Sequence, residues 1–389
     1  MAVGHRRRPP PATDGLMQVA PAAFHLARHA RLRDDLRAAS LDALLITSLP
    51  NVAYLTGLFA SAAAAVISAG QFVLIVDGRY LPTAKLRQRD LPGLDLALVL
   101  TTGSFEEAMA EVLGSFGNVR AGFEAAHMSV RQHRDLTARL AAGAAKIEIE
   151  GTEGLVEARR AIKDDWELQT LRDAAGRLSD AAKCIIPKAL AGQREREVAG
   201  LVDMELRRVG FQKPAFDTIV AAGPNSAIPH YRTGERRLET GDLVVLDFGG
   251  LHHGYAVDLT RTIVVGGAGP RERRLLEQVA EAQAAAFSAV RVGCLASDVD
   301  RAARAVLERE GLGEAFSHGT GHGLGLEVHE RPRLARYRPE LPGEALQAGM
   351  VLTIEPGAYL DGWGGARIED DVVVTPDGAE WLTDVPRVL

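Results

Sequence analysis

"GDLVVLDFGGLHHGYAVDLTRT", residues 241–262, places two aspartates inside two apolar runs that are separated by a His-His-Gly sequence. Asp247 and Asp258 stand where an unpaired carboxylate would be costly to bury, so each needs a partner. The alternation of apolar residues is typical of strands, and we expect a hairpin that turns about His252 and His253. In that hairpin positions 247 and 258 face each other directly, which brings like charges together unless a cation lies between them.

A second pair of acids repeats this arrangement near the end of the chain. In "VLTIEPGAYLDGWGGARIEDDVVV", Glu355 ends one apolar run and Glu369 begins another, and the two positions are symmetric about Gly362. The turn residues between them predict a second hairpin with a second opposed pair. Four buried carboxylates in one site are best explained by bound cations. One divalent ion would leave much of their negative charge uncompensated, and two would balance it.

Nitrogen ligands for such a site are available in "SHGTGHGLGLEVHE", which contains His318, His322 and His329. Its glycines argue against a helix, so we predict a loop with exposed imidazoles. His329 and Glu330 do not begin an HExxH zinc motif. A lone histidine or a single acid beside a turn is more often structural, and we interpret the acids at positions 370 and 371 in this way.

Composition excludes several classes of protein. The 389 residues are too many for one ordinary core, and 47% hydrophobic with 25% charged residues is typical of a soluble globular chain. A net charge of −6 predicts no nucleic-acid partner, and no apolar run is long enough to span a membrane. Residues 1–20 lack the apolar stretch of a signal peptide and are predicted to be a disordered tail. Cys184 and Cys294 are far apart, which suits a reducing cytoplasm.

Hydrophobic periodicity predicts an α/β domain over residues 21–154 and a second domain over residues 155–389. The second domain begins where Asp164 and Glu167 have the spacing of a helical capping box. Helices are predicted at 24–40, 129–141, 163–190, 194–210, 272–290 and 296–310, and strands at 41–47, 71–78 and 146–150, with a buried strand or turn at 60–70.

The motifs "VLDFGG", "YAVDLTRT", "GTGHGLG", "TIEPG" and "RIEDD" follow one another along the second domain. In this order they resemble the pita-bread (M24) metallopeptidases, the family of Xaa-Pro dipeptidases (prolidases), aminopeptidase P and methionine aminopeptidase. In the first domain "NVAYLTG", "VDGRY" and "AGFE" are similar to the N-terminal domain that prolidases and aminopeptidase P share with creatinase. The resemblance implies a creatinase-like α/β domain followed by a pseudo-symmetric pita-bread catalytic domain of α+β type.

The resemblance also assigns roles to particular residues. It implies that Glu355 transfers the proton, that His230 and His329 contact the substrate carbonyl or carboxylate, and that Arg367 orients the site or the substrate carboxylate. Tyr359 would contact residues of the site without binding the metal ions itself. The implied metal ligands are Asp247, Asp258, His322, Glu355 and Glu369, of which Asp258 and Glu369 would bridge two ions.

The implied reaction is hydrolysis of an Xaa-Pro peptide bond by a hydroxide that bridges two divalent ions. Oxygen donors with one imidazole suit Mn²⁺, Fe²⁺, Co²⁺ and Zn²⁺, of which we expect Mn²⁺ first. The resemblance further implies a peptide substrate with proline at its second position and a homodimer.

Other functions compatible with the same motifs stay open. A dipeptidase and an aminopeptidase would carry the same ligands, and so would a metal-dependent enzyme of this fold that acts on a non-peptide substrate, such as a carbon-sulfur lyase or an ectoine-type hydrolase. Non-catalytic binding modules of this fold and creatinase itself typically lack the complete ligand set, which this chain has.

Overall fold

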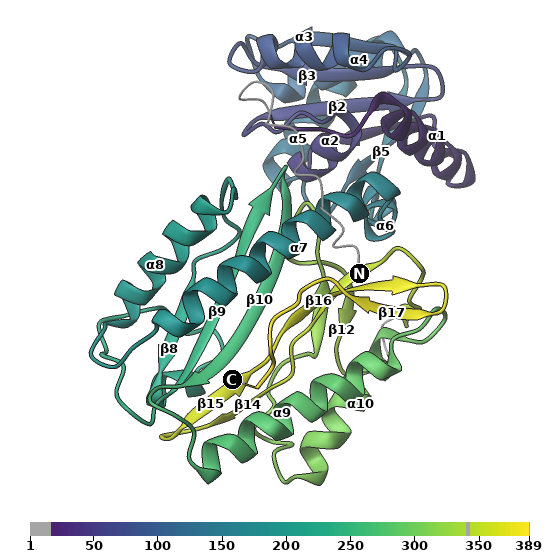
Figure 1. Ribbon diagram of the computed structural model, residues 1–389. Coiled ribbons are helices and arrows are strands. Elements are labelled where there is room, and N and C mark those ends of the chain that lie inside the picture. Colours follow the sequence, from purple (N-terminus) through teal and green to yellow (C-terminus); the bar gives the residue numbers. More distant parts are fainter. Residues whose placement is uncertain (1–16, 340–342, 389) are drawn as a thin grey trace, which may run out of the picture.

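The computed structural model of the protein describes residues 17–339 and 343–388. Figure 1 shows a smaller N-terminal part, in purple and blue, next to a larger part that contains the rest of the chain. The predicted tail at 1–20 falls mostly outside the described residues. Residues 17–20 are neither helix nor strand, yet Ala20 is buried and the Met17 carbonyl accepts a hydrogen bond from Arg87. These four residues therefore pack on the protein instead of forming a free tail.

The N-terminal part is an α/β structure around one mixed sheet. Its strand order in the described chain is β4-β3-β2-β1-β5-β6, in which β2 runs antiparallel to β1 and β3 and the other pairs are parallel. β1 is buried on both faces, because Leu44 and Ile46 face one hydrophobic core while Ala43 and Leu45 face the other. The strands are β1 (Ala43–Ile46), β2 (Ala63–Ser68), β3 (Phe72–Val76), β4 (Leu96–Leu100), β5 (Val119–Glu124) and β6 (Ile147–Thr152). The helices are α1 (Ala22–Ala38), α2 (Leu49–Thr56), α3 (Leu81–Asp90), α4 (Phe105–Ser115) and α5 (Val130–Ala142).

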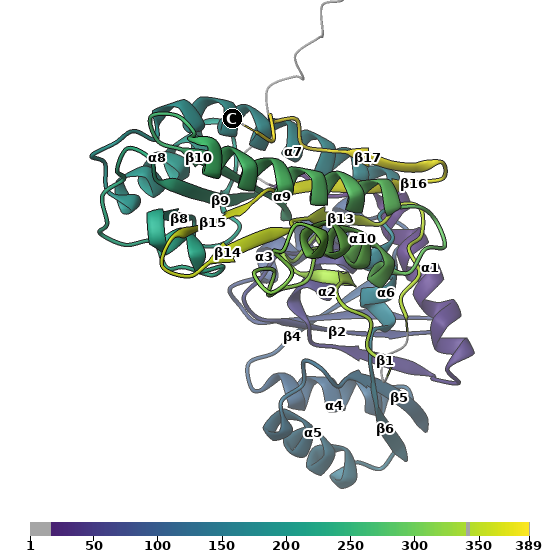
Figure 2. The ribbon, with the colours of Figure 1, turned by 90° about the horizontal axis from the view of Figure 1, so that it is seen from below.

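The larger part has two similar halves, and in each half a pair of helices covers the outer side of a group of strands (Figure 2). α7 begins at the predicted capping box, where Asp164 and Glu167 each accept the backbone N–H of the other. The first half contains α7 (Asp165–Ile185), α8 (Glu195–Arg208), β7 (Lys213–Pro214), β8 (Ile219–Ala222), β9 (Leu243–His252) and β10 (Tyr255–Val264). The second half contains α9 (Pro270–Ala289), α10 (Ala296–Arg309), β11 (Gly321–Gly323), β12 (Glu330–Leu334), β13 (Val351–Ile354), β14 (Gly357–Leu360), β15 (Gly364–Arg367), β16 (Asp370–Thr375) and β17 (Gly378–Trp381). Helix α6 (Leu155–Ala161) lies between the two parts.

This architecture confirms the predicted fold class, a creatinase-like α/β domain followed by a pseudo-symmetric catalytic domain. The predicted helices are confirmed with shifted ends: α7 ends at Ile185 rather than at 190, and α1 and α9 begin two residues earlier than predicted. The strands predicted at 41–47, 71–78 and 146–150 correspond to β1, β3 and β6. The stretch 60–70 contains the buried strand β2. In the described part of the chain, no helix is long and apolar enough to cross a membrane.

The turn of the first hairpin lies one residue later than the sequence indicated. His252 is paired with Tyr255 at the ends of β9 and β10, so the turn consists of His253 and Gly254. Both turn residues have positive φ, +49° and +83°. A two-residue turn of this kind needs positive φ at both positions, and glycine adopts it without strain, so the turn is placed by Gly254 rather than by the two histidines.

This register changes the relation between the two aspartates. Asp258 lies opposite Gly249, and Asp247 lies opposite Thr260, so the predicted direct opposition is wrong. Because Asp247 and Gly249 are two residues apart on one strand, both point to the same face of the sheet. The two carboxylates are therefore diagonal neighbours on one face, which still places them in one site.

Candidate metal centre

Strands β9 and β10 carry Asp247 and Asp258 into the interior, where both side chains are buried. The backbone N–H of Asp258 donates to Asp371 Oδ2 at 3.1 Å, which fixes the strand at this position. Gly249, opposite Asp258, leaves room that a side chain would fill, because a Cβ there would lie 2.3 Å from the Val257 carbonyl oxygen and 2.8 Å from the Phe216 ring. The glycine thus lets an aromatic ring pack over the same face that carries the aspartates.

The second pair, Glu355 and Glu369, lies as the sequence predicted. Two ladders flank these glutamates, β13/β16 on one side and β14/β15 on the other, and both have a register that is symmetric about Gly362. The same register places Glu355 opposite Glu369 in the gap between the ladders. Gly362 has φ +72°, as the turn requires. Glu369 also forms a bridge to Thr260 on β10, whose hydroxyl donates to Glu369 Oε2 at 2.6 Å. This bridge joins the two halves at the site.

His322 lies in strand β11 and is buried, so the prediction of an exposed loop imidazole is wrong for it. Flanking glycines explain the difference: a Cβ at Gly321 would lie 2.0 Å from the Thr353 carbonyl oxygen, and one at Gly323 would lie 2.1 Å from the Arg331 carbonyl oxygen. They let β11 fit closely between its neighbours. His322 Nδ1 lies 3.0 Å from the Gly323 carbonyl oxygen, which can only accept, so Nδ1 carries the proton and Nε2 presents a lone pair.

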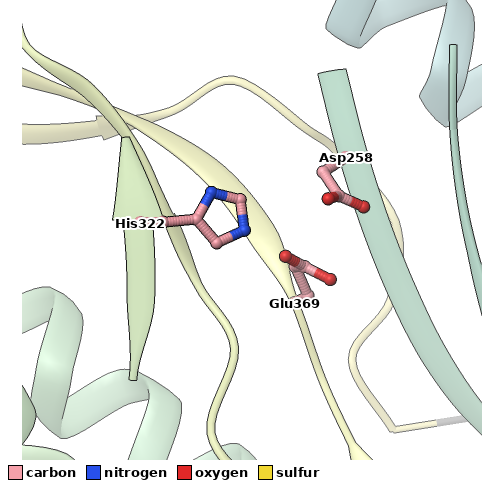
Figure 3. Close-up of side chains that lie close together, drawn as sticks. All are labelled: Asp258, His322 and Glu369. Carbon is pink, nitrogen blue, oxygen red and sulfur yellow. The ribbon is translucent and has the colours of Figure 1, made fainter. Parts of the chain in front are cut away.

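Three of the predicted ligands converge closely, as Figure 3 shows. Among the described residues, Asp258, His322 and Glu369 offer ligand atoms that all lie within 4.8 Å of one another. Glu355 adjoins this group, because its Oε1 lies 3.6 Å from His322 Nε2. Asp247 completes the set from the other side, where its Oδ2 is held by Arg367.

Burial and mutual repulsion raise the pKa values of these acids. Desolvation raises the pKa of Asp258 well above its usual value, and the carboxylates of Asp247 and Asp371 raise it further. Glu369 is shifted in the same direction by burial and by Asp258. Burial raises the pKa of Glu355 to about 7, with Asp247 adding to the shift and Arg367 opposing it. Burial and like-charge repulsion thus oppose ionisation of these acids, and a cation between them would favour it.

The site has free donor atoms for divalent cations. Asp247 Oδ1 and Asp258 Oδ1 are buried and have no hydrogen-bond partner among the described residues, although buried carboxylate oxygens are normally paired. The His322 Nε2 lone pair faces the same space. Several carboxylate oxygens with one imidazole nitrogen form a donor set that divalent transition metals accept. The residues present therefore fit the ions that the resemblance implies.

Arg367 is buried beside the acids and donates hydrogen bonds to several groups around them. Its Nη2 donates to Asp247 Oδ2 at 2.6 Å, and its Nη1 donates to the Tyr359 hydroxyl at 2.8 Å and the Pro229 carbonyl at 3.2 Å. The Tyr359 hydroxyl in turn donates to His318 Nε2 at 2.8 Å, since His318 Nδ1 donates to the Gly319 carbonyl. His318 is thus used in this chain of hydrogen bonds and is half-buried, not exposed. The guanidinium orients Asp247.

The acids next to Glu369 contact protein groups. Asp370 Oδ1 accepts from the buried Arg261 at 2.7 Å and from Thr383 at 2.6 Å. Arg261 also donates to the backbone carbonyls of Thr260 and Glu369, so it ties the two halves together behind the centre. Asp371 holds the backbone of Asp258, as described above.

A cavity of about 1020 Å³ opens in front of the acids, and His230 and His329 line it. The His329 ring lies 4.3 Å from the His322 ring, and its side chain is largely exposed. By contrast, His252 does not line this cavity. It lies at the end of the β9/β10 hairpin, where its Nε2 is 2.9 Å from Asp173 Oδ2.

Arg333 also lines this cavity, and sequence reasoning missed it. It is paired with His322 across the β11/β12 ladder, so both side chains point to the same face. Its exposed guanidinium makes no ion pair or hydrogen bond with any of the residues that the structure describes. No motif marks this arginine, because its role depends on strand pairing across a loop.

Comparison with known proteins agrees with this site. Residues 169–376 match the model of metallopeptidase family M24, and residues 28–162 match that of the creatinase/prolidase N-terminal domain. The chain belongs to metallopeptidase family M24. It is a metallopeptidase, and the family implies divalent metal ions, which the donor atoms of the site fit.

Three similar proteins illustrate the range of this family. The Xaa-Pro dipeptidase of Pyrococcus horikoshii is 34% identical over 350 residues, which cover 90% of this chain and 95% of that protein. The structure of an Xaa-Pro dipeptidase from Bacillus anthracis matches with a TM-score of 0.85 at 33% identity and covers 94% of this chain and 100% of that one. An X-Pro aminopeptidase from Thermotoga maritima matches with a TM-score of 0.82 at 30% identity, with coverage of 93% and 99%. Similarity alone does not choose between dipeptides and longer peptides.

Proposed function

We propose that this M24 metallopeptidase is an Xaa-Pro dipeptidase that hydrolyses the bond before a C-terminal proline. The observation that carries the choice is Arg333, an exposed guanidinium without a protein partner in the described chain, next to His322 in the catalytic cavity. A dipeptide places its free carboxylate one residue beyond the scissile carbonyl, and a guanidinium fork binds a carboxylate through two hydrogen bonds. An aminopeptidase substrate has a neutral amide at this position and would form no ion pair with the guanidinium.

Asp247, Asp258, His322, Glu355 and Glu369 are proposed to hold two divalent ions, with Mn²⁺ expected first. When bound, such ions act as Lewis acids on a carbonyl and lower the pKa of a shared water toward 7. The unpartnered oxygens of Asp247 and Asp258 are available as donor atoms for these ions. Arg367 and Thr260 keep the acids oriented, because they bond to oxygens of Asp247 and Glu369.

Glu355 is proposed to transfer the proton in the reaction. An amide nitrogen is a poor leaving group until it is protonated, so a group near the attacking water must accept a proton and return it. The raised pKa of Glu355, about 7 in the protein without ions, shows how little its carboxylate is solvated. Its position on the cavity wall beside His322 lets it reach both the water and the substrate nitrogen.

The histidines at the cavity entrance are proposed to orient the substrate. His230 follows Pro229, whose carbonyl is fixed by Arg367, and His329 stands against the His322 ring. Both imidazoles are within the cavity lining and can hydrogen-bond the scissile carbonyl or the carboxylate. The proline nitrogen of the substrate carries no N–H. Recognition therefore has to use the carbonyl and carboxylate oxygens of the substrate together with the shape of the proline ring. The Phe216 ring supplies an apolar wall.

The test is hydrolysis of the bond before proline in Ala-Pro compared with Ala-Pro-Ala, followed in both cases as release of the N-terminal alanine, using protein loaded with Mn²⁺ and a chelated sample as control. We expect chelator-sensitive cleavage of Ala-Pro and little cleavage of the tripeptide. Glu355→Gln, which keeps the size of the side chain, should lose turnover. Cleavage of the tripeptide at a similar rate would instead support an X-Pro aminopeptidase, which the wide cavity would admit. Metal binding without cleavage of either peptide would point to a non-peptide substrate.

Three further proposals accompany this function. We propose a homodimer in the cytoplasm, to be checked by light scattering of the purified protein and by fractionation of cells. We also propose domains at 21–154 and 155–389, since helix α6 begins at Leu155 where the chain leaves the first sheet.

A further inference from the structure

A buried chain of polar side chains runs from the N-terminal domain toward the catalytic cavity. Asn51 of α2 is fully buried and donates through Nδ2 to Glu124 Oε1 at 2.6 Å. Glu124 is itself fixed, because its Oε2 accepts the backbone N–H groups of Thr47 and Ser48. Asn51 Oδ1 then accepts from Arg160 Nη1 of helix α6 at 2.7 Å. The side chain of Arg160 is thereby anchored on the N-terminal sheet.

The other end of the same guanidinium holds the loop that carries His329. Arg160 Nη2 donates to Glu327 Oε2 at 2.7 Å and to Glu330 Oε1 at 2.5 Å, and these two glutamates flank His329. Glu330 Oε1 also accepts the backbone N–H of Glu327 at 3.0 Å, which closes the loop upon itself. The side chains of Arg160 and Glu330 are 2% and 6% exposed, so the contact between them is weakly screened, whereas Glu327 is partly exposed.

The loop held in this way is a wall between two cavities. His329 and Arg333 line the catalytic cavity, and both also line a cavity of about 450 Å³ at the junction of the two domains. Arg333 follows Glu330 on the same strand, β12. A shift of Glu330 would therefore move both His329 and Arg333 at the catalytic cavity.

We propose that Asn51, Arg160 and Glu330 are positioning residues, through which the N-terminal domain sets the place of His329 and Arg333 at the catalytic cavity. The guanidinium suits this role because Nη1 reaches Asn51 on one side and Nη2 reaches both glutamates on the other, whereas an ammonium offers one nitrogen only. The terminal nitrogens of Arg160 are bonded on both sides, and Lys163 Nζ adds a contact to Glu330 Oε2 at 3.1 Å, so these contacts hold the wall in place. The proposal rests on the dipeptidase function for its kinetic part only.

The variant that tests it is Arg160→Lys, which keeps the charge and removes the fork. Asn51→Ala is a second variant that leaves Arg160 intact but takes away its anchor. The matched control is Arg28→Lys. Arg28 is equally buried at the domain junction, where it bonds Asp164 and the Tyr54 carbonyl, but it makes no hydrogen bond or ion pair with Glu327 or Glu330. Both arginine variants should lower the melting temperature, so stability alone will not separate them.

The first measurement is hydrogen exchange of the metal-loaded full chain, followed at residues 325–330. The Glu327 amide is bonded to Glu330, so loss of the fork should increase exchange of this loop about fivefold or more. Arg28→Lys should leave the loop unchanged. This measurement needs no turnover, so it decides the structural part even if Xaa-Pro peptides prove not to be substrates. Unchanged loop exchange in both Arg160→Lys and Asn51→Ala would overturn the proposal.

The second measurement is a double-mutant cycle on Ala-Pro hydrolysis. Arg160→Lys alone should lower kcat/KM by about tenfold, as expected for a displaced charge-assisted contact. In a His329→Ala, Arg333→Met background the same change should have less than about a twofold effect, because the groups that it positions are gone. Full additivity in that background would refute positioning through the wall and would leave a general loss of stability as the cause.

Discussion

Replacement of Arg333 by methionine tests whether the enzyme recognises a free carboxylate. Methionine keeps an unbranched side chain of similar length and removes the charge, so the β11/β12 pairing with His322 should persist. Hydrogen bonds to charged groups contribute about 1.5–3 kcal/mol, and the exposure of Arg333 favours the lower end of this range. About 1.5 kcal/mol corresponds to roughly tenfold in KM.

The assay compares Ala-Pro with Ala-Pro-amide, which has the same scissile bond and lacks the negative charge. The native enzyme should favour Ala-Pro by about tenfold in kcat/KM, and Arg333→Met should abolish this preference by weakening Ala-Pro alone. Arg336→Met, an exposed arginine beyond the end of β12, is the matched control and should change neither substrate. Metal content should stay equal in all samples.

Equal loss of activity toward both substrates would refute the reasoning, because Arg333 would then act on the metal centre or on the fold. A preference for Ala-Pro that survives in the variant would show that another group binds the carboxylate. In that case His230 and His329, which line the same cavity, are the next candidates.

Three other predictions concern the centre and the fold. Glu369→Ala should remove bound metal and turnover together, as measured by metal analysis after dialysis and by proline release; normal activity would contradict the dinuclear site. Glu330→Gln should destabilise the protein above pH 4.5, since burial would raise the pKa of Glu330 but Lys163 and Arg160 lower it to about 2. The contribution, about 3 kcal/mol from a shift of this size, should be complete above the unfolded pKa and should fade as the pH falls from 4.5 toward 2. The free energies of unfolding of the two proteins in urea should therefore differ by about 3 kcal/mol at pH 7 and by less than about 1 kcal/mol at pH 2.5. Gly250→Ala should lower the free energy of unfolding by about 1–3 kcal/mol, because the added Cβ would lie 2.4 Å from the Phe211 ring. An unchanged melting temperature would show that the ring moves freely.

Local patterns in the sequence determined most of the secondary structure and the chemical nature of the site. The capping box at Asp164 marked the start of α7, and apolar periodicity marked the long helices. The acids could be recognised because a carboxylate inside an apolar run is costly unless it has a partner. The Glu355–Glu369 pair could even be aligned, since turn residues on both sides of Gly362 left one symmetric register.

Tertiary structure decided what depends on contacts between distant segments. The pairing of Asp247 and Asp258 was set by positive φ at His253 and Gly254, which the sequence alone did not reveal. His322 was buried by neighbouring strands that approach its flanking glycines, so a glycine-rich stretch that predicted a loop became a strand. Arg333 and Arg160 have no local signal at all. Their roles arise because strand pairing and domain contact place them beside partners far away in the chain. The free energy of such contacts depends on both segments and cannot be predicted from either one alone.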